Sequence, residues 1–102
     1  MRIRDFKDGR KVFIITGHDN NPANLYIKEV YLMKGILQLT SDGWYTRVDK
    51  PEDSFMKYFI GYDINGNYYP VTPITTFKDK DTAKTMLRLW LRKAFYREIN
   101  HI

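Results

Sequence analysis

Residues 79–102 read DKDTAKTMLRLWLRKAFYREINHI, and this is the one long stretch of the chain whose apolar residues recur with helical periodicity. Those residues fall on one stripe of a helix, as they must if the helix packs on a core. The stripe consists of Ala83, Met86, Leu87, Trp90, Leu91 and Ala94. Because Asp79 is a good N-cap, the pattern predicts a helix over residues 79–99, with Trp90 as its central buried residue.

The opposite side of the predicted helix is less ordinary. Lys84, Arg88 and Arg92 recur every four residues and form a basic ridge. Apolar side chains lie among or beside this ridge, namely Leu89, Phe95, Tyr96 and Ile99. A helix with two apolar sides usually has two neighbours. Two interpretations are open: a loop or the N-terminal arm covers this side, or it is a binding or dimerisation surface.

The rest of the chain reads mostly as β structure. A basic arm over residues 1–9 precedes residues 10–77, in which short apolar runs alternate with turns. Residues 10–16 are apolar on both faces, which predicts a strand in the interior of a sheet, and residues 44–48 read as a further short strand. We therefore predict an α+β fold, an antiparallel β-meander of about five or six short strands packed against one C-terminal α-helix. The alternative is an SH3-like, partly closed barrel with an appended helix.

The signals over residues 22–34 are mixed. Pro22 near the start and Gly35 past the end suit a helix. A two-residue turn at Lys34-Gly35 would instead make a hairpin that gathers alternating apolar residues on one face. We predict strands for this stretch.

A second hairpin is expected around Asn65-Gly66, a pair that fits a type I′ turn. Pairing outward from this turn gathers one set of side chains on a face that we expect to pack against the helix; they are Tyr58, Ile60, Tyr62, Tyr69, Val71 and Pro73. Because Pro70 and Pro73 lack backbone N–H donors, this strand should lie at an edge or be broken.

The composition is that of one folded domain, which we take to span residues 1–102. Of the 102 residues, 43% are hydrophobic and 16% aromatic, which is enough for a single core and argues against disorder. The absence of cysteine excludes disulfides, thiolate zinc sites and cysteine nucleophiles. No apolar run approaches the ~20 residues that span a bilayer. We therefore expect a cytoplasmic protein with no membrane partner.

The net charge of +5 is concentrated at the two ends of the chain. Residues 1–12 carry five basic and two acidic side chains, and residues 79–102 carry six and three. If the termini lie close together, as they often do in domains, the two ends form one positive patch. Such a patch is the candidate nucleic-acid-binding site, with phosphate contacts from Arg2, Arg4, Arg10, Lys84, Arg88 and Arg92.

No catalytic, metal-binding or nucleotide-binding motif is present. His18 and His101 are far apart in the sequence and have no cysteine to join them, so we expect no metal site and no cofactor. Six carboxylates come in or next to predicted turns, where local hydrogen bonding explains them; they are Asp19, Asp42, Asp49, Glu52, Asp53 and Asp63. We therefore expect that the protein is not an enzyme.

Aromatic residues are abundant, with eight Tyr, six Phe and two Trp. Rings of this kind stack on unpaired bases in nucleic-acid-binding proteins, and they also form the anchors of protein interfaces. The candidates for a stacking platform are Tyr26, Tyr31, Trp44, Tyr45, Tyr58, Phe59, Tyr68 and Tyr69. About half of them should be buried in the core if the predicted alternation is right.

In general layout, a short run of strands followed by one terminal helix, the chain resembles the small accessory proteins of phages and mobile elements. The resemblance covers the layout alone. It implies stoichiometric binding to a larger host or viral machine, as in inhibitors of polymerases, nucleases or defence complexes.

These observations favour a small non-enzymatic binding or regulatory module that acts on a protein or a protein–nucleic-acid complex. The predicted partner-binding residues are Arg88, Leu89, Arg92, Phe95 and Tyr96. A homodimer through the same outer face of the helix is a related prediction. Direct nucleic-acid binding is the alternative function, and a small hydrolase or nuclease comes a distant third.

Overall fold

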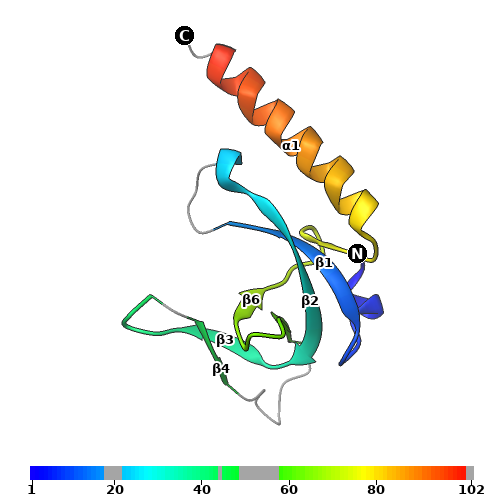
Figure 1. Cartoon of the computed structure of the whole chain (residues 1–102), viewed down its shortest axis with the longest axis vertical. Coiled ribbons are helices and arrows are strands. Elements are labelled where there is room, and N and C mark those ends of the chain that lie inside the picture. Colours follow the sequence, from blue (N-terminus) through cyan, green and yellow to red (C-terminus); the bar gives the residue numbers. More distant parts are fainter. Residues whose placement is uncertain (18–21, 44, 49–57, 101–102) are drawn as a thin grey trace.

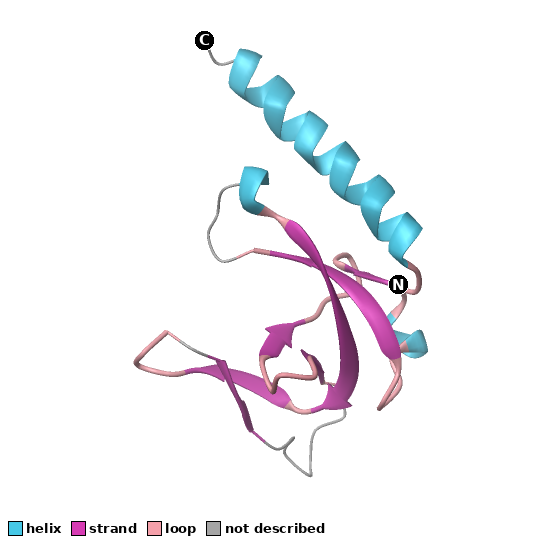
Figure 2. Cartoon of the chain, in the orientation of Figure 1, coloured by secondary structure: helices cyan, strands magenta, loops and turns pink. Residues whose placement is uncertain are grey.

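The computed structural model describes residues 1–17, 22–43, 45–48 and 58–100, with backbone alone at 22, 39, 45 and 94–100. Its elements follow one another along the chain as shown in Figures 1 and 2. They are the 3-10 helices η1 (Ile3–Asp5) and η2 (Pro22–Asn24), the strands β1 (Lys11–Thr16), β2 (Tyr26–Lys34), β3 (Ile36–Leu39), β4 (Tyr45–Val48), β5 (Phe59–Tyr62), β6 (Tyr68–Pro70) and β7 (Thr76–Phe77), and the helix α1 (Lys80–Asn100). None of the helices in these ranges is both long and apolar enough to cross a membrane.

The fold is α+β, as predicted, with two antiparallel sheets. Five strands form one sheet in the order β6-β5-β2-β1-β7, and β3 pairs with β4 in a second sheet. The order refines the predicted meander, because the chain leaves the large sheet after β2 and returns beside β2 as β5. Strand β7 then pairs with β1 through Phe13 and Ile14. No ladder joins the two sheets within the described ranges, so they do not close into one barrel.

Strand β1 lies in the interior of the sheet and has apolar packing on both faces, as its sequence predicts. One face carries a core cluster of Phe6, Val12, Ile14, Val30 and Leu32, each no more than 4% exposed. The other face contributes Ile15, which is buried with Phe77 and Ala83 against the helix. Alternation of side chains along β1 therefore divides the core into two layers, one on each side of the sheet.

Residues 26–34 form a single long strand, which confirms the strand prediction for most of 22–34, but the predicted hairpin at Lys34-Gly35 is wrong. Strand β2 pairs with β1 along its first part and with β5 along its last part, and it does not pair with β3. At Gly35 the chain turns into the second sheet with φ of 154°, and the Gly35 N–H donates to the carbonyl of Tyr58.

The second hairpin is present, but its register differs from the prediction. Tyr62 pairs with Tyr68 across a five-residue turn, whereas a two-residue turn would pair Tyr62 with Tyr69. A type I′ turn needs positive φ at both central residues, and Gly66 alone in this turn has it, at 82°. Relative to the predicted register, this one-residue shift moves each side chain of β6 to the other face of the sheet.

The register shift separates the side chains that were expected to share one face, because Tyr62 pairs with Tyr68 instead of Tyr69. Tyr69 and Val71 pack against the core cluster on the sheet face opposite α1. The helix instead contacts β1, β2, β7 and η2. Close packing at the hairpin also requires a glycine at position 61, because a Cβ there would lie 2.9 Å from Cγ2 of Val30.

Helix α1 begins where the sequence predicts. The carboxylate of Asp79 accepts hydrogen bonds from the backbone N–H of Thr82 at 2.8 Å and from the Thr82 hydroxyl, which is N-cap geometry. Ala83 is fully buried, and Met86, Leu87 and Trp90 pack at the edge of the same cluster.

Trp90, predicted as the central buried residue of the helix, packs against the core cluster but is only partly buried. The helix packs on the sheet through its N-terminal part, and its C-terminal end extends beyond the sheet (Figure 1). The apolar stripe is therefore longer than the sheet surface that covers it.

Candidate functional site

The basic ridge predicted on the outer side of α1 is exposed to solvent where the structure describes its side chains. Lys84, Arg88 and Arg92 are all exposed, and successive members lie about 6 Å apart along the helix axis. None of the three forms an ion pair with another residue in the described ranges. Within the part of the chain that the structure describes, the ridge thus presents three cations without an ion-pair partner.

An apolar side chain lies directly beside this ridge. Leu89 is 43% exposed, so neither a loop nor the N-terminal arm covers the helix at this position. The arm packs elsewhere, because Phe6 is buried in the core cluster on the opposite face of the sheet. Phe95 and Tyr96, the other apolar members of the predicted site, continue the helix, and their side chains lie outside the described part.

The basic N-terminal arm lies beside the residues that lead into α1. The amino group of Met1 donates to the carbonyls of Pro73 at 2.7 Å and Thr76 at 2.9 Å, which holds the arm near the beginning of α1. A helix of 21 residues is about 30 Å long. Figure 1 shows that α1 runs away from that point. The condition for a single patch, that the two ends of the chain lie close together, is therefore not met.

The predicted nucleic-acid-binding residues belong to two elements, the N-terminal arm and α1. Arg2 and Arg4 are exposed on and beside η1, and the Arg10 guanidinium donates to the carbonyl of Asp5 at 2.8 Å. The remaining members are the cations of the ridge on α1. A nucleic acid that contacted all of these residues would have to span both elements.

The aromatic residues do not supply an exposed stacking platform in the described ranges. Phe59 and Tyr69 pack against the core cluster, and Tyr31 lies against Tyr62 with ring centroids 5.7 Å apart. The remaining candidates with described side chains, Tyr26, Tyr58 and Tyr68, are also partly buried. Trp44 lies outside the described residues, as does the side chain of Tyr45.

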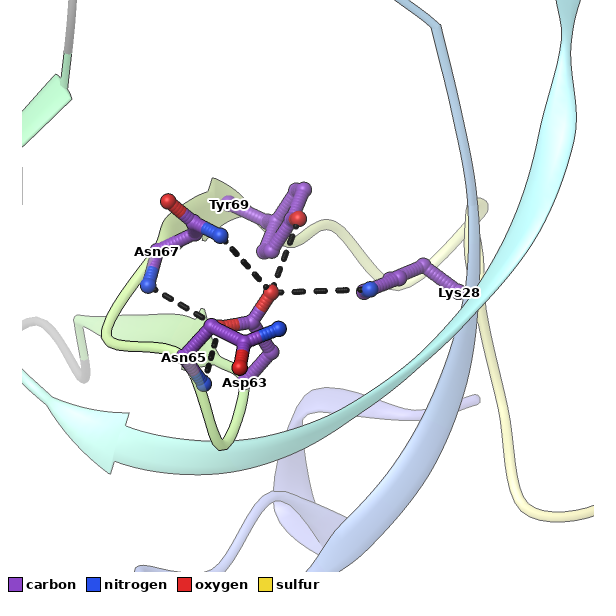
Figure 3. A network of polar contacts seen from close by, with 5 residues as sticks. All are labelled: Lys28, Asp63, Asn65, Asn67 and Tyr69. Carbon is purple, nitrogen blue, oxygen red and sulfur yellow. Dashed lines mark hydrogen bonds and ion pairs between the residues drawn. The ribbon is translucent and has the colours of Figure 1, made fainter.

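One predicted turn carboxylate, Asp63, has a larger role than its sequence suggests. It follows β5 and is only 6% exposed, yet it is fully hydrogen-bonded (Figure 3). Its Oδ1 accepts from the backbone N–H groups of Asn65 and Asn67, both at 2.9 Å. Its Oδ2 accepts from the Asn67 side-chain amide and the Tyr69 hydroxyl, both at 3.1 Å, and lies 3.5 Å from Nζ of Lys28.

These contacts change the acidity of two groups. Burial alone would raise the pKa of Asp63, but the hydrogen bonds from Asn67, Tyr69 and Asn65 outweigh it and lower the pKa from 3.8 to about 2. Burial, together with the hydrogen bond to the Asp63 carboxylate, raises the pKa of Tyr69 from 10.0 to about 12. Asp63 therefore stays ionised and Tyr69 stays neutral across the physiological range.

We expect these two groups to limit stability at the two extremes of pH. Because the folded state lowers the pKa of Asp63, its stabilisation is present above pH 3.8 and is lost as the pH falls toward 2. Because the folded state raises the pKa of Tyr69, its stabilisation is present below pH 10 and is lost as the pH rises toward 12.

Urea unfolding at a series of pH values measures both effects. The Asp63 contribution should be about 1 to 2 kcal/mol, and Asp63→Asn should flatten the acid side of the profile. Tyr69→Phe should flatten the alkaline side. Profiles that these substitutions leave unchanged would contradict the assigned contacts.

The Asp63 cluster is arranged for structure more than for chemistry. Both carboxylate oxygens already accept hydrogen bonds, so the group has no free acceptor position aimed at a substrate. No group of three or more metal-ligating side chains exists among the described residues. Asp42 is exposed. The other histidines and carboxylates considered as catalytic or metal-binding candidates lie outside the described residues; they are His18, Asp19, Asp49, Glu52, Asp53 and His101.

Sequence reasoning placed Asp63 correctly in a turn but missed its long-range partners. The local signal was available, because an aspartate that precedes Asn-Gly commonly accepts hydrogen bonds from its own turn. Nothing in the neighbouring sequence points to Lys28 or Tyr69.

Comparison with protein families, with curated proteins and with solved structures finds no match to this chain.

Proposed function

We propose that this protein is a small, non-enzymatic binding module that acts stoichiometrically on a protein or a protein–nucleic-acid complex through the outer face of α1. The observation that carries the proposal is the exposed Leu89 beside Arg88 and Arg92, which are exposed and form no ion pair with any described residue. The mode of action would be that of the accessory proteins whose layout it resembles, namely inhibition or regulation of a larger machine in the cytoplasm.

The combination of residues favours a protein partner. Arginine beside an exposed apolar side chain is typical of protein interfaces, in which buried anchors supply most of the energy and charges at the rim mainly guide association. A surface that recognises phosphates alone has no need of Leu89. The end of α1 beyond the sheet also leaves room for a partner, or for a second copy of the chain, to lie along it (Figure 1).

Direct nucleic-acid binding is the second candidate, and one observation favours it. The three cations of the ridge form no ion pair within the described ranges, so they are available for phosphate contacts. Against it, the basic arm lies beside the beginning of α1 and the ridge extends along the helix away from it, so the positive charge is spread over two elements.

The test compares two variants of α1 against the partner isolated by affinity capture and against generic DNA and RNA. Leu89→Ser should weaken binding to the partner about tenfold or more, because it removes a desolvated anchor. Arg88→Ala/Arg92→Ala should mainly slow association.

Circular dichroism should first show that both variants are folded. Ile74→Ser is the matched control, since Ile74 is 75% exposed and lies outside α1. Tight binding to nucleic acid that is lost with the arginines and indifferent to Leu89 would replace this proposal with the second candidate.

A further inference from the structure

The turn between β5 and β6 displays the most exposed large hydrophobic residue in the described ranges. Ile64 is 88% exposed, which exceeds the 75% of Ile74 and about twice the 43% of Leu89. Single exposed apolar residues are common on protein surfaces and need no explanation by themselves. Ile64 differs because of the structure that holds it.

The turn that carries Ile64 is fixed from several directions. The backbone N–H of Gly66 donates to the carbonyl of Asp63, and the N–H of Asp63 donates to the carbonyl of Asn67. The Asp63 side chain then accepts the N–H groups on the far side of the turn, those of Asn65 and Asn67. Backbone and side chain together close both ends of a loop of five residues.

The same aspartate ties the turn to the body of the domain. Lys28, which belongs to β2, approaches Oδ2 of Asp63 at 3.5 Å, and Tyr69 of β6 donates to the same oxygen (Figure 3). A turn needs none of these long-range contacts merely to reverse the chain. Their effect is to hold the turn in one conformation, with Ile64 pointing into solvent.

We propose that the β5–β6 turn is a preorganised insertion element, in which Ile64 enters an aliphatic pocket on a partner protein. A rigid turn loses little conformational freedom on binding, so more of the energy from burying Ile64 appears as affinity. The proposal concerns a surface separate from α1. Strands β1 and β2 lie between α1 and β6, and Tyr69 packs on the sheet face opposite the helix (Figure 1).

The chemistry around Ile64 fits a protein pocket and not a membrane. Membrane-binding loops expose aromatic residues together with lysine or arginine, whereas the exposed residues next to Ile64 are Asn65, Gly66 and Asn67 and the flanking Tyr62 and Tyr68 are partly buried. These neutral amide residues suit a pocket whose rim offers hydrogen-bonding groups. The inference rests on the proposed function only in requiring that the partner be a protein.

The test uses an aliphatic diazirine amino acid placed at position 64, at 89 or at 74, with photo-crosslinking in extract of the source cell. A partner protein that crosslinks at 64 and not at 74 is then purified. Its affinity is measured for the unmodified chain, Ile64→Ala and Ile74→Ala. We expect Ile64→Ala to weaken binding about tenfold or more and Ile74→Ala to leave it unchanged.

A third variant tests preorganisation separately from contact. Asp63→Asn keeps Ile64 but removes the negative charge of the carboxylate that contacts Lys28 and Tyr69. This variant should remain folded and bind the partner more weakly. Equal affinity for the unmodified chain and Ile64→Ala, or crosslinks at 64 to lipid or nucleic acid alone, would overturn the insertion element.

The crosslinking positions distinguish the two proposals. Protein adducts at 89 but not at 64 would leave the α1 surface standing and overturn the inference. Adducts at 64 but not at 89 would support the insertion element and contradict the α1 surface. Absence of protein adducts at both positions would contradict both.

Discussion

Replacing Leu32 with alanine is expected to lower the free energy of unfolding by about 3 to 5 kcal/mol. Leu32 is fully buried in the cluster with Phe6, Val12, Ile14 and Val30, on the face of the sheet away from α1. The loss combines the transfer of the side chain with the cavity left between strands that other contacts hold in place. Urea unfolding followed by tryptophan fluorescence measures it.

Leu89→Ala is the matched control for this prediction. It is the same chemical change at a site that is 43% exposed on a helix, so the expected effect is within about 0.5 kcal/mol. Similar losses for the two variants would mean that the core is not on the sheet face assigned to it.

Replacing Asp63 with alanine should cost about 2 to 4 kcal/mol, the second largest effect we expect. The change leaves Lys28 and the Tyr69 hydroxyl without their shared acceptor, and it frees the N–H groups of Asn65 and Asn67. Removing one partner of a buried polar network costs more than the network contributes as a whole, because the remaining groups stay desolvated. Thermal and urea unfolding at neutral pH test this.

Two variants separate the parts of that effect. Asp63→Asn keeps one carbonyl acceptor for the turn and should lose only about half as much as alanine. Asp42→Ala removes an exposed aspartate from another turn and should lie within about 0.5 kcal/mol of the unmodified protein. A neutral Asp63→Ala would show that the network does not hold the hairpin.

Local signals were sufficient for the elements that depend on neighbours in the sequence. The start of α1 was predicted because Asp79 caps the helix through Thr82, three residues along the same chain. Strand β1 was predicted to be interior because its side chains are apolar on both faces, and the core clusters confirm it. In both cases the decisive contacts follow from one short stretch.

Features that depend on distant partners could not be predicted in this way. The sequence at Lys34-Gly35 suits a tight turn, but the path of the chain is decided by the pairing of β2 with β5 and of β3 with β4. The periodicity of α1 shows which side is apolar and cannot show how far the sheet reaches beneath it. Trp90 is therefore only partly buried, although it lies in the middle of the stripe.

Of the two candidate sites, one follows from local sequence and the other depends on distant partners. The ridge and Leu89 on α1 were identified from helical spacing, and their exposure in the structure agrees with that placement. Ile64 was not identified from the sequence, because the contacts of Asp63 with Lys28 and Tyr69 that hold its turn are not visible in the residues Asp-Ile-Asn-Gly. The contacts that hold this turn come from residues of other strands, so they appear only in the folded structure.

The most direct test of the central claim, that α1 binds a protein surface through Leu89, is the salt dependence of affinity for the captured partner. Calorimetric titration between about 50 and 200 mM salt distinguishes the two kinds of recognition, since contacts to several phosphates would lower affinity by well over tenfold across that range. We predict a change smaller than about tenfold for the unmodified protein and a loss of about tenfold or more for Leu89→Ser at every salt concentration. Affinity that falls steeply with salt and ignores Leu89→Ser would contradict the account.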